Sequence, residues 1–284
     1  MRFLVLGAAG MAGHLISLYL RERGHDVTGF ARHDLPFLEF QVRGDVTDMT
    51  DLQPIVREGY DVVINCVGVL NKAAETNSDA AWLNGELPHV LADMTADLPT
   101  RVFHMSTDCV FAGNTGPYTE ASEPDGTSAY DRTKAAGELD DGKNLTFRNS
   151  IVGADMNPKG IGLLKWFMQQ PGPVKGFTGA IWTGLTTLEL AKAMEHEAKE
   201  DAHGLVNMVP EGSINKCDLL GLFNKELRGG RIEITPDGDL QLDKTLVRTN
   251  FAPTYRPKPY PEQVREMAGW VRAHRELYPH YEVI

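Results

Sequence analysis

Residues 2–30 read RFLVLGAAGMAGHLISLYLRERGHDVTGF, and this stretch decides the fold. The apolar run at 2–6 predicts a buried strand, helical spacing of apolar residues predicts a helix over 11–23, and Gly24 suits the end of that helix. A second strand begins at Asp26. The glycines of residues 7–13 lie between strand and helix, where backbone amides and the positive helix end can hold a pyrophosphate. The order of these parts predicts a dinucleotide-binding βαβ unit.

The alternation of strands and helices continues to about residue 150. Six strand-like segments separated by helices predict an α/β fold with a Rossmann-type doubly wound parallel sheet. We therefore assign residues 1–150 to a dinucleotide-binding domain. The later strands are expected at 38–42, 61–66, 101–106 and 145–150, with helices near 52, over 80–98 and over 130–139.

After residue 150 the pattern changes to short strands and turns rich in glycine and proline. One helix is expected at 187–199, so residues 178–204 are predicted to return to the first domain. Residues 151–177 and 205–284 are expected to form a smaller C-terminal substrate-binding region. The four prolines of residues 253–261 exclude a helix and predict a linker, with a ligand for an SH3-type domain as the alternative.

Composition narrows the range of partners. The chain has 284 residues and a formal net charge of −11, which argues against a nucleic acid polymer as partner. The apolar runs are too short for a signal peptide or a membrane span, so we expect a cytoplasmic protein with no membrane partner. Cys66, Cys109 and Cys217 form no CxxC pair, and HExxH is absent, so we predict free thiols and no metal site.

The glycine-rich turn is expected to bind the cofactor through Gly7, Gly10, Met11 and Gly13. Its spacing is GxxGxxG rather than the more familiar GxGxxG, and glycines that serve only helix packing are the alternative. The second strand ends in Ala31-Arg32-His33, where an acidic residue would bind the ribose of NAD. Arg32 therefore favours NADP, with NAD as the alternative if this arginine is only a solvated surface residue.

Two later segments follow strands that end at the same edge of the sheet. Asp45 and Val46 come after the third expected strand and are predicted to touch the adenine. Cys66, Val67 and Gly68 end the fourth and are predicted to lie beside the cofactor.

A YxxxK motif lies in the helix expected at 130–139. Tyr130 and Lys134 are four residues apart, so they share one helix face. The ammonium of Lys134 would lower the phenol pKa of Tyr130 and make it an acid-base catalyst, and Lys134 would also hold the nicotinamide ribose. Thr107 ends the fifth strand and is predicted to bind the substrate carbonyl oxygen. The alternative is that Tyr130 and Lys134 share a helix surface by chance and have no catalytic role.

The motifs GAAGMAG, DVTD, DVVINC, STDCVFAG and YDRTK followed by AAGE resemble the dTDP-4-dehydrorhamnose reductase family of extended short-chain dehydrogenases, over about residues 1–150. The resemblance implies an NAD(P)-dependent oxidoreductase with Thr107, Tyr130 and Lys134 as the catalytic trio. It also implies that the substrate is a 4-keto-6-deoxy nucleotide-sugar reduced at C4, in polysaccharide biosynthesis.

The chain departs from the family pattern at the substrate side. Cys109 stands where related 4,6-dehydratases carry a glutamate, which weakens a dehydratase reading. Arg148-Asn149-Ser150 stands where the family has an RTSW-like run with its tryptophan facing the sugar. Trp182 either stacks on the substrate or belongs to the core. The residues expected to bind the substrate are Ser106, Thr107, Asp108, Asn149, Ser150 and Trp182.

Two other functions stay open from sequence. The first is a nucleotide-sugar epimerase or dehydratase that returns the hydride to the same sugar. The second is a regulatory subunit that binds a dinucleotide without turnover. A homodimer is compatible with all three functions.

Overall fold

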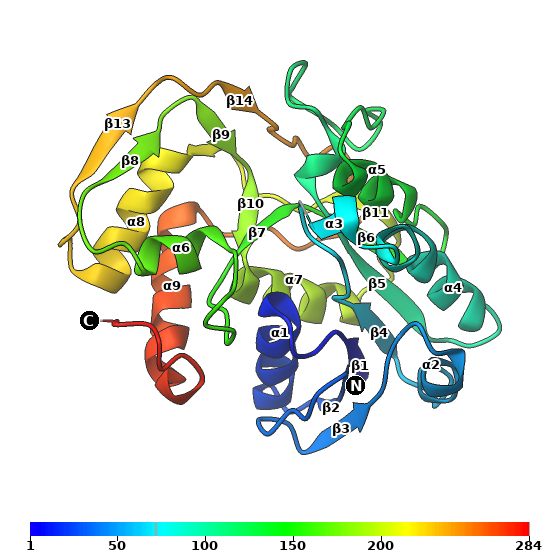
Figure 1. Ribbon diagram of the computed structural model, residues 1–284. Coiled ribbons are helices and arrows are strands. Elements are labelled where there is room, and N and C mark those ends of the chain that lie inside the picture. Colours follow the sequence, from blue (N-terminus) through cyan, green and yellow to red (C-terminus); the bar gives the residue numbers. More distant parts are fainter. Residues whose placement is uncertain (72, 284) are drawn as a thin grey trace.

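The computed structural model describes residues 1–71 and 73–283. Its centre is a parallel sheet with the strand order β11-β6-β5-β4-β1-β2-β3 (Figure 1). The strand order reverses between β1 and β4, which makes this junction the topological switch point. The predicted Rossmann-type α/β fold is therefore confirmed. The strands of the main sheet are β1 (Arg2–Leu6), β2 (Asp26–Ala31), β3 (Phe40–Arg43), β4 (Val62–Asn65), β5 (Arg101–Ser106), β6 (Leu145–Arg148) and β11 (Gly204–Asn207).

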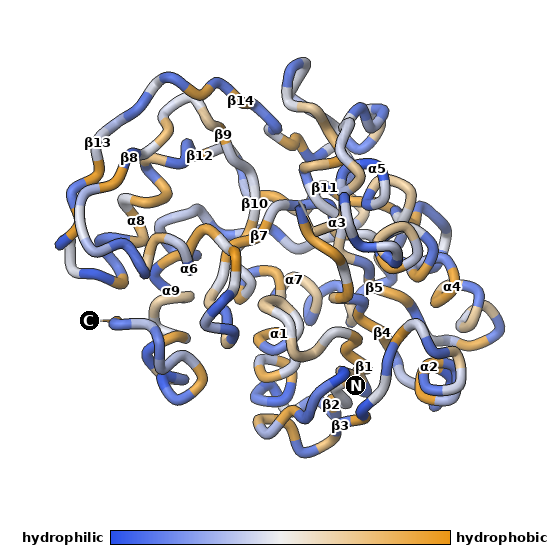
Figure 2. The backbone as a smooth tube through the Cα atoms, in the orientation of Figure 1, coloured by the Kyte–Doolittle hydropathy of each residue, from blue (hydrophilic) through white to orange (hydrophobic). Residues whose placement is uncertain are grey.

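Alternating side chains of the central strands enter two different cores. In β1, Phe3 and Val5 join the cluster under α1 and α7, whereas Leu4 and Leu6 join the cluster under α2 and α4. Because both faces of the sheet are covered, β1 and β4 are apolar over most of their length, as Figure 2 shows. The helices over the sheet are α1 (Met11–Glu22), α2 (Met49–Val56), α4 (Leu87–Met94), α5 (Ala129–Ala136) and α7 (Thr187–Lys199).

The helix expected over 80–98 is two elements. A π-helical turn covers Trp82–Glu86, and α4 begins at Leu87 with Pro88 in its first turn. Proline is tolerated there because the first amides of a helix have no partner within it. The turn also packs closely on α5, since a Cβ at Gly137 would lie 2.0 Å from the carbonyl oxygen of Asn84.

The C-terminal half contains more helix than the sequence pattern indicated. Only α7 was expected, but α6 (Leu163–Met168), α8 (Lys216–Arg228) and α9 (Tyr260–Ala273) also pack there (Figure 1). No helix in residues 1–71 and 73–283 is long and apolar enough to cross a membrane. The remaining elements are β7 (Ser150–Val152), β8 (Val174–Phe177), β9 (Ala180–Trp182), β10 (Gly184–Thr186), β12 (Ile214–Asn215), β13 (Ile234–Asp237), β14 (Leu242–Asp243), α3 (Ala73–Thr76), α6 (Leu163–Met168), α8 (Lys216–Arg228) and α9 (Tyr260–Ala273).

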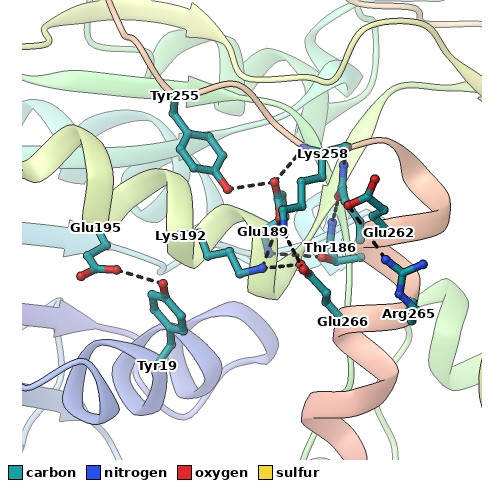
Figure 3. A network of polar contacts seen from close by, with 11 residues as sticks. Tyr19, Thr186, Glu189, Lys192, Glu195, Tyr255, Lys258, Glu262, Arg265 and Glu266 are labelled. Atoms are coloured by element: carbon teal, nitrogen blue, oxygen red, sulfur yellow. Dashed lines mark hydrogen bonds and ion pairs between the residues drawn. The ribbon is translucent and has the colours of Figure 1, made fainter.

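The proline-rich segment is a packed connection as far as Pro259. The expectation that it excludes a helix is wrong at its end, because Tyr260 and Pro261 form the start of α9, where proline is tolerated. Glu189 of α7 accepts hydrogen bonds of 2.8 Å from the Tyr255 hydroxyl and from the Lys258 backbone amide (Figure 3). The Lys258 ammonium also pairs with Glu266 of α9 at 2.5 Å. These contacts fasten the segment to two helices, and sequence spacing could not show them.

The domain boundaries stay a prediction. Helix α7 packs against α1. β11, which begins at Gly204, the last residue of the segment 178–204 that was expected to return, adds a seventh strand to the main sheet. The buried cluster under α1 continues into α8 and α9, so the two halves share one core.

Candidate active site

A cleft of about 330 Å³ opens at the carboxyl edge of the main sheet. Residues at or just after the ends of β1, β2, β3 and β4 line it, next to the switch point where ligands of such sheets bind. The structure therefore brings most of the expected cofactor residues to one place. Those lining the cleft are Gly7, Gly10, Arg32, Asp45, Val46, Cys66, Val67 and Gly68.

The glycine-rich turn has a shape that a pyrophosphate fits. Gly7 has a φ of +73°, and a Cβ there would lie 3.1 Å from the carbonyl group of Cys66. Gly10 precedes α1 without a side-chain cap, so the first amides of the helix are open to an anion. A side chain at either glycine would fill the space that the ligand needs.

Met11 and Gly13 support this turn and are not among the residues that line the cleft. A Cβ at Gly13 would lie 2.3 Å from the carbonyl oxygen of Gly7, so this glycine allows α1 to approach the turn. The sulfur of Met11 faces Gly162 in the C-terminal half. The geometry of Gly13 thus favours the packing alternative for that residue.

Arg32 and Asp45 place opposite charges at the end of the cleft beside β2 and β3. The exposed Arg32 follows β2 directly. The pKa of Asp45 is lowered, first by a hydrogen bond from the Thr47 amide and further by the positive charge of Arg32. Among the described residues that line the cleft, Arg32 is the one arginine or lysine.

Tyr130 and Thr107 meet next to the cleft but are not among the residues that line it. Val69 of the lining packs against the cluster that contains Tyr130. Ser128 and Asp131 form a capping box that starts α5 and places Tyr130 in its first turn. Tyr130 is 8% exposed, and burial raises its pKa, while a hydrogen bond with the Thr107 side chain acts in the opposite direction. Nearby negative charge from Cys109 and Asp108 also raises this pKa. In the chain by itself Tyr130 is therefore a protonated phenol.

Lys134 lies one turn after Tyr130, with its side chain turned inward. Its ammonium nitrogen Nζ donates a 2.6 Å hydrogen bond to the Met105 carbonyl and lies 3.3 Å from Nε2 of His104. Burial lowers the pKa of Lys134 to about 8. The contact with His104 had not been anticipated, although this residue precedes the STD motif by only two positions.

Asp108 faces two lysines from the C-terminal half that sequence reasoning missed. It accepts a 3.1 Å hydrogen bond from the Thr107 hydroxyl. Burial raises its pKa, and the charges of Lys216 and Lys244 partly oppose that rise. Lys216 begins α8 and lies 5.5 Å above the Trp182 ring. No local motif marks these lysines, because they reach Asp108 from more than a hundred residues away.

The other residues expected at the substrate are mostly held within the protein. Ser106 donates to Glu138, which also forms a buried bidentate pair with Arg148. Trp182 is only 3% exposed and packs 5.6 Å from the Tyr260 ring, which favours its core alternative.

Asn149 and Ser150 directly follow β6, at the edge of the main sheet where the parallel strands have their carboxyl ends. Within the described chain, the side-chain oxygen Oδ1 of Asn149 is buried and has no hydrogen-bond partner. Ser150 starts β7 and is half-buried. The described residues contain no cluster of three or more histidine, cysteine or acidic side chains that could hold a metal ion.

Comparison with known proteins gives the relatives of this chain. Residues 3–140 match the model of the NAD dependent epimerase/dehydratase family. A dTDP-4-keto-6-deoxy-D-glucose reductase of Streptomyces niveus is 36% identical over 141 residues, which covers 48% of this chain and 46% of that protein. The matched part thus spans about half the length of the curated relatives.

Solved structures are similar over nearly the whole chain. A dTDP-4-dehydrorhamnose reductase from Clostridium acetobutylicum aligns with a TM-score of 0.76 and 23% identity, over 96% of this chain and 100% of its own. A dTDP-4-dehydrorhamnose reductase from Bacillus anthracis in complex with NADP aligns with a TM-score of 0.78 and 17% identity, over 94% and 98%. At these identities the likeness shows the fold, including that of the C-terminal half.

Proposed function

We propose that this chain, whose residues 3–140 match the model of the NAD dependent epimerase/dehydratase family, is a reductase of a 4-keto-6-deoxy nucleotide-sugar that uses NADPH. One observation carries the proposal: a protonated Tyr130 lies against Thr107, beside a cleft lined by the glycine-rich turn. Reduction of a ketone needs a proton donor at the carbonyl oxygen, and a buried phenol supplies it.

Three side chains have separate roles in the proposed reaction. The reduced nicotinamide, when bound, supplies a hydride to the carbonyl carbon. Thr107 steadies the carbonyl oxygen, and the Tyr130 hydroxyl gives that oxygen its proton, so the ketone becomes an alcohol. Lys134 holds the nicotinamide ribose, and in its ammonium form it would favour the phenolate of Tyr130. Solvent then returns a proton to the Tyr130 phenolate.

The preference for NADPH rests on Arg32. This side chain follows β2 at the cleft, where a 2′-phosphate would bring two negative charges beside a guanidinium. The Bacillus anthracis relative was solved with NADP, which agrees with this preference.

The substrate is inferred from the relatives and from Cys109. The similar Streptomyces niveus protein is named for the reduction of a dTDP-linked keto-sugar. An elimination of water needs a second proton carrier beside Tyr130, and burial raises the pKa of the Cys109 thiol to about 12. Cys109 is therefore a poor replacement for a carboxylate, which favours simple reduction. We assign the sugar to residues 151–177 and 205–284.

The test is the loss of absorbance at 340 nm with NADPH and with NADH, on a panel of 4-keto nucleotide-sugars. Tyr130→Phe should lower kcat by about 10³-fold, since general acid catalysis contributes on the order of 10²–10⁴. Tyr60→Phe is the matched control, because Tyr60 is equally buried but lies in the core under α2. Product formed without net NADPH oxidation would instead identify an epimerase or dehydratase.

A further inference from the structure

Two polar residues lie buried behind the side chain of Lys134. Asn65 ends β4 and His104 lies in the adjacent strand β5. Both are completely buried, and Lys134 is only 4% exposed. Because water does not reach these groups, each donor and acceptor among them has to find its partner in the protein.

The orientation of the Asn65 amide is fixed by the backbone. Its oxygen Oδ1 accepts a 3.1 Å hydrogen bond from the Val67 amide, so its nitrogen Nδ2 points the other way. Nδ2 lies 3.3 Å from Nδ1 of His104. An amide nitrogen can only donate, so Nδ1 of His104 is the acceptor, and the proton of the neutral ring lies on Nε2.

The Nε2–H group of His104 then faces the Nζ nitrogen of Lys134 at 3.3 Å. Lys134 Nζ donates to the Met105 carbonyl and still has to accept from His104. An ammonium has three donors and no acceptor, whereas a neutral amine has a lone pair. We infer that Asn65 and His104 are positioning residues that favour the neutral amine form of Lys134 in the cofactor-free chain.

The surrounding charges are compatible with this arrangement. Burial lowers the pKa of Lys134 to about 8, against smaller opposite effects of Glu138 and Cys66. The pKa of His104 falls well below its ordinary value, chiefly because of burial, and a positive charge on Lys134 or His89 would lower it further. The ring of His104 therefore stays neutral, and a doubly protonated ring does not explain its contact with Lys134.

The consequence for catalysis rests on the proposed function, but the inference itself does not. A neutral Lys134 exerts no positive charge on Tyr130, so Tyr130 keeps the proton that it donates during reduction. Lys134 must gain a proton before its charge can favour the phenolate. Asn65 and His104 thus act on the reaction through Lys134.

The ring nitrogens of His104 report the arrangement directly. In ¹⁵N-labelled, cofactor-free protein at pH 8.5, we expect His104 to be protonated on Nε2 and bare on Nδ1, with its signals assigned by their loss in His104→Gln. His14 is the internal control. Its Nδ1 lies 2.9 Å from the Gly10 carbonyl, which can only accept, so it should show the opposite tautomer. A proton on Nδ1 of His104 would overturn the inference.

Asn65→Asp reverses the hydrogen bonds without changing the shape of the side chain. A carboxylate still accepts from Val67 but also accepts from Nδ1–H, so Nε2 becomes an acceptor and favours the ammonium. With ¹³Cε-labelled lysine we expect the Lys134 pKa to rise from about 8 to about 9.5 or above. If Asn65→Asp folds and the pKa of Lys134 is unchanged, the inference is contradicted. If the variant does not fold, the tautomer of His104 in the wild-type protein decides whether the inference holds. Neither readout needs turnover, so a failed reductase assay leaves both intact.

Discussion

The two halves of the chain are held by different kinds of contact. The N-terminal half is a ladder of parallel strands, with apolar side chains alternating into two cores. The C-terminal half shares part of this apolar core, has short strands, and is held in addition by buried carboxylates of α7. Among them, Glu189 and Glu195 bind distant parts of the chain (Figure 3). The comparison teaches that local patterns describe the first half, whereas tertiary contacts define the second.

The largest expected effect concerns the polar contact inside the N-terminal half. Arg148→Met leaves the carboxylate of Glu138 buried without its bidentate partner, at side-chain exposures of 3% and 7% in the native pair. We expect a loss of about 3–5 kcal/mol in the free energy of unfolding, measured by urea denaturation. The control is Arg57→Met, which removes an exposed pair with Asp97 and should change little. Equal effects of the two variants would contradict this account.

Alanine substitutions at Gly13 in α1 and Gly269 in α9 compare how tightly a helix is packed in each half. Gly13→Ala places a methyl group against the backbone of the glycine-rich turn, so it should destabilise the chain by about 2–3 kcal/mol and weaken NADPH binding. Gly269→Ala in α9 meets open space and should stabilise by about 0.5–1 kcal/mol. Thermal unfolding and cofactor titration measure both. If Gly13→Ala binds NADPH normally, the close approach of α1 is unimportant.

Glu195 joins the two halves and makes stability depend on pH. Burial acts to raise its pKa, but hydrogen bonds from Lys199, His25 and Tyr19 lower it to about 2, from an ordinary value of 4.5. The stabilisation is therefore present above about pH 4.5 and is lost as the pH falls toward 2. Glu195→Gln should cost about 2 kcal/mol at pH 7, and the difference from wild type should shrink below pH 4.5. A difference that does not change with pH would contradict this.

The smallest expected effect tests Arg32. Arg32→Ser should reduce the preference for NADPH over NADH by about 10-fold, which corresponds to about 1.4 kcal/mol. The ratio of kcat/KM for the two cofactors measures it. Arg43→Ser, which removes an exposed cation outside the cleft lining, should leave the ratio unchanged. A constant ratio in Arg32→Ser would make this arginine a surface residue.

Sequence predicted what depends on neighbouring residues. The apolar run of β1, the glycines at 7, 10 and 13 and the spacing of Tyr130 and Lys134 are local features, so the fold and the position of the cleft could be derived from them. Other features depend on packing between distant segments. These are the π-helical turn before α4, helices α8 and α9, and the approach of Lys216 to Asp108. The inward turn of Lys134 toward His104 likewise follows from burial, which no spacing shows.

The central claim is net reduction of a sugar ketone, and transfer of a deuterium label tests it most directly. With NADPH carrying deuterium at the transferable position of C4 and a 4-keto-6-deoxy nucleotide-sugar, mass spectrometry of the product should show one deuterium per sugar and one NADP⁺ formed. Tyr130→Phe should abolish the transfer. Product that forms without deuterium, while NADPH stays reduced, would contradict the reductase and identify an enzyme that returns the hydride to its own substrate.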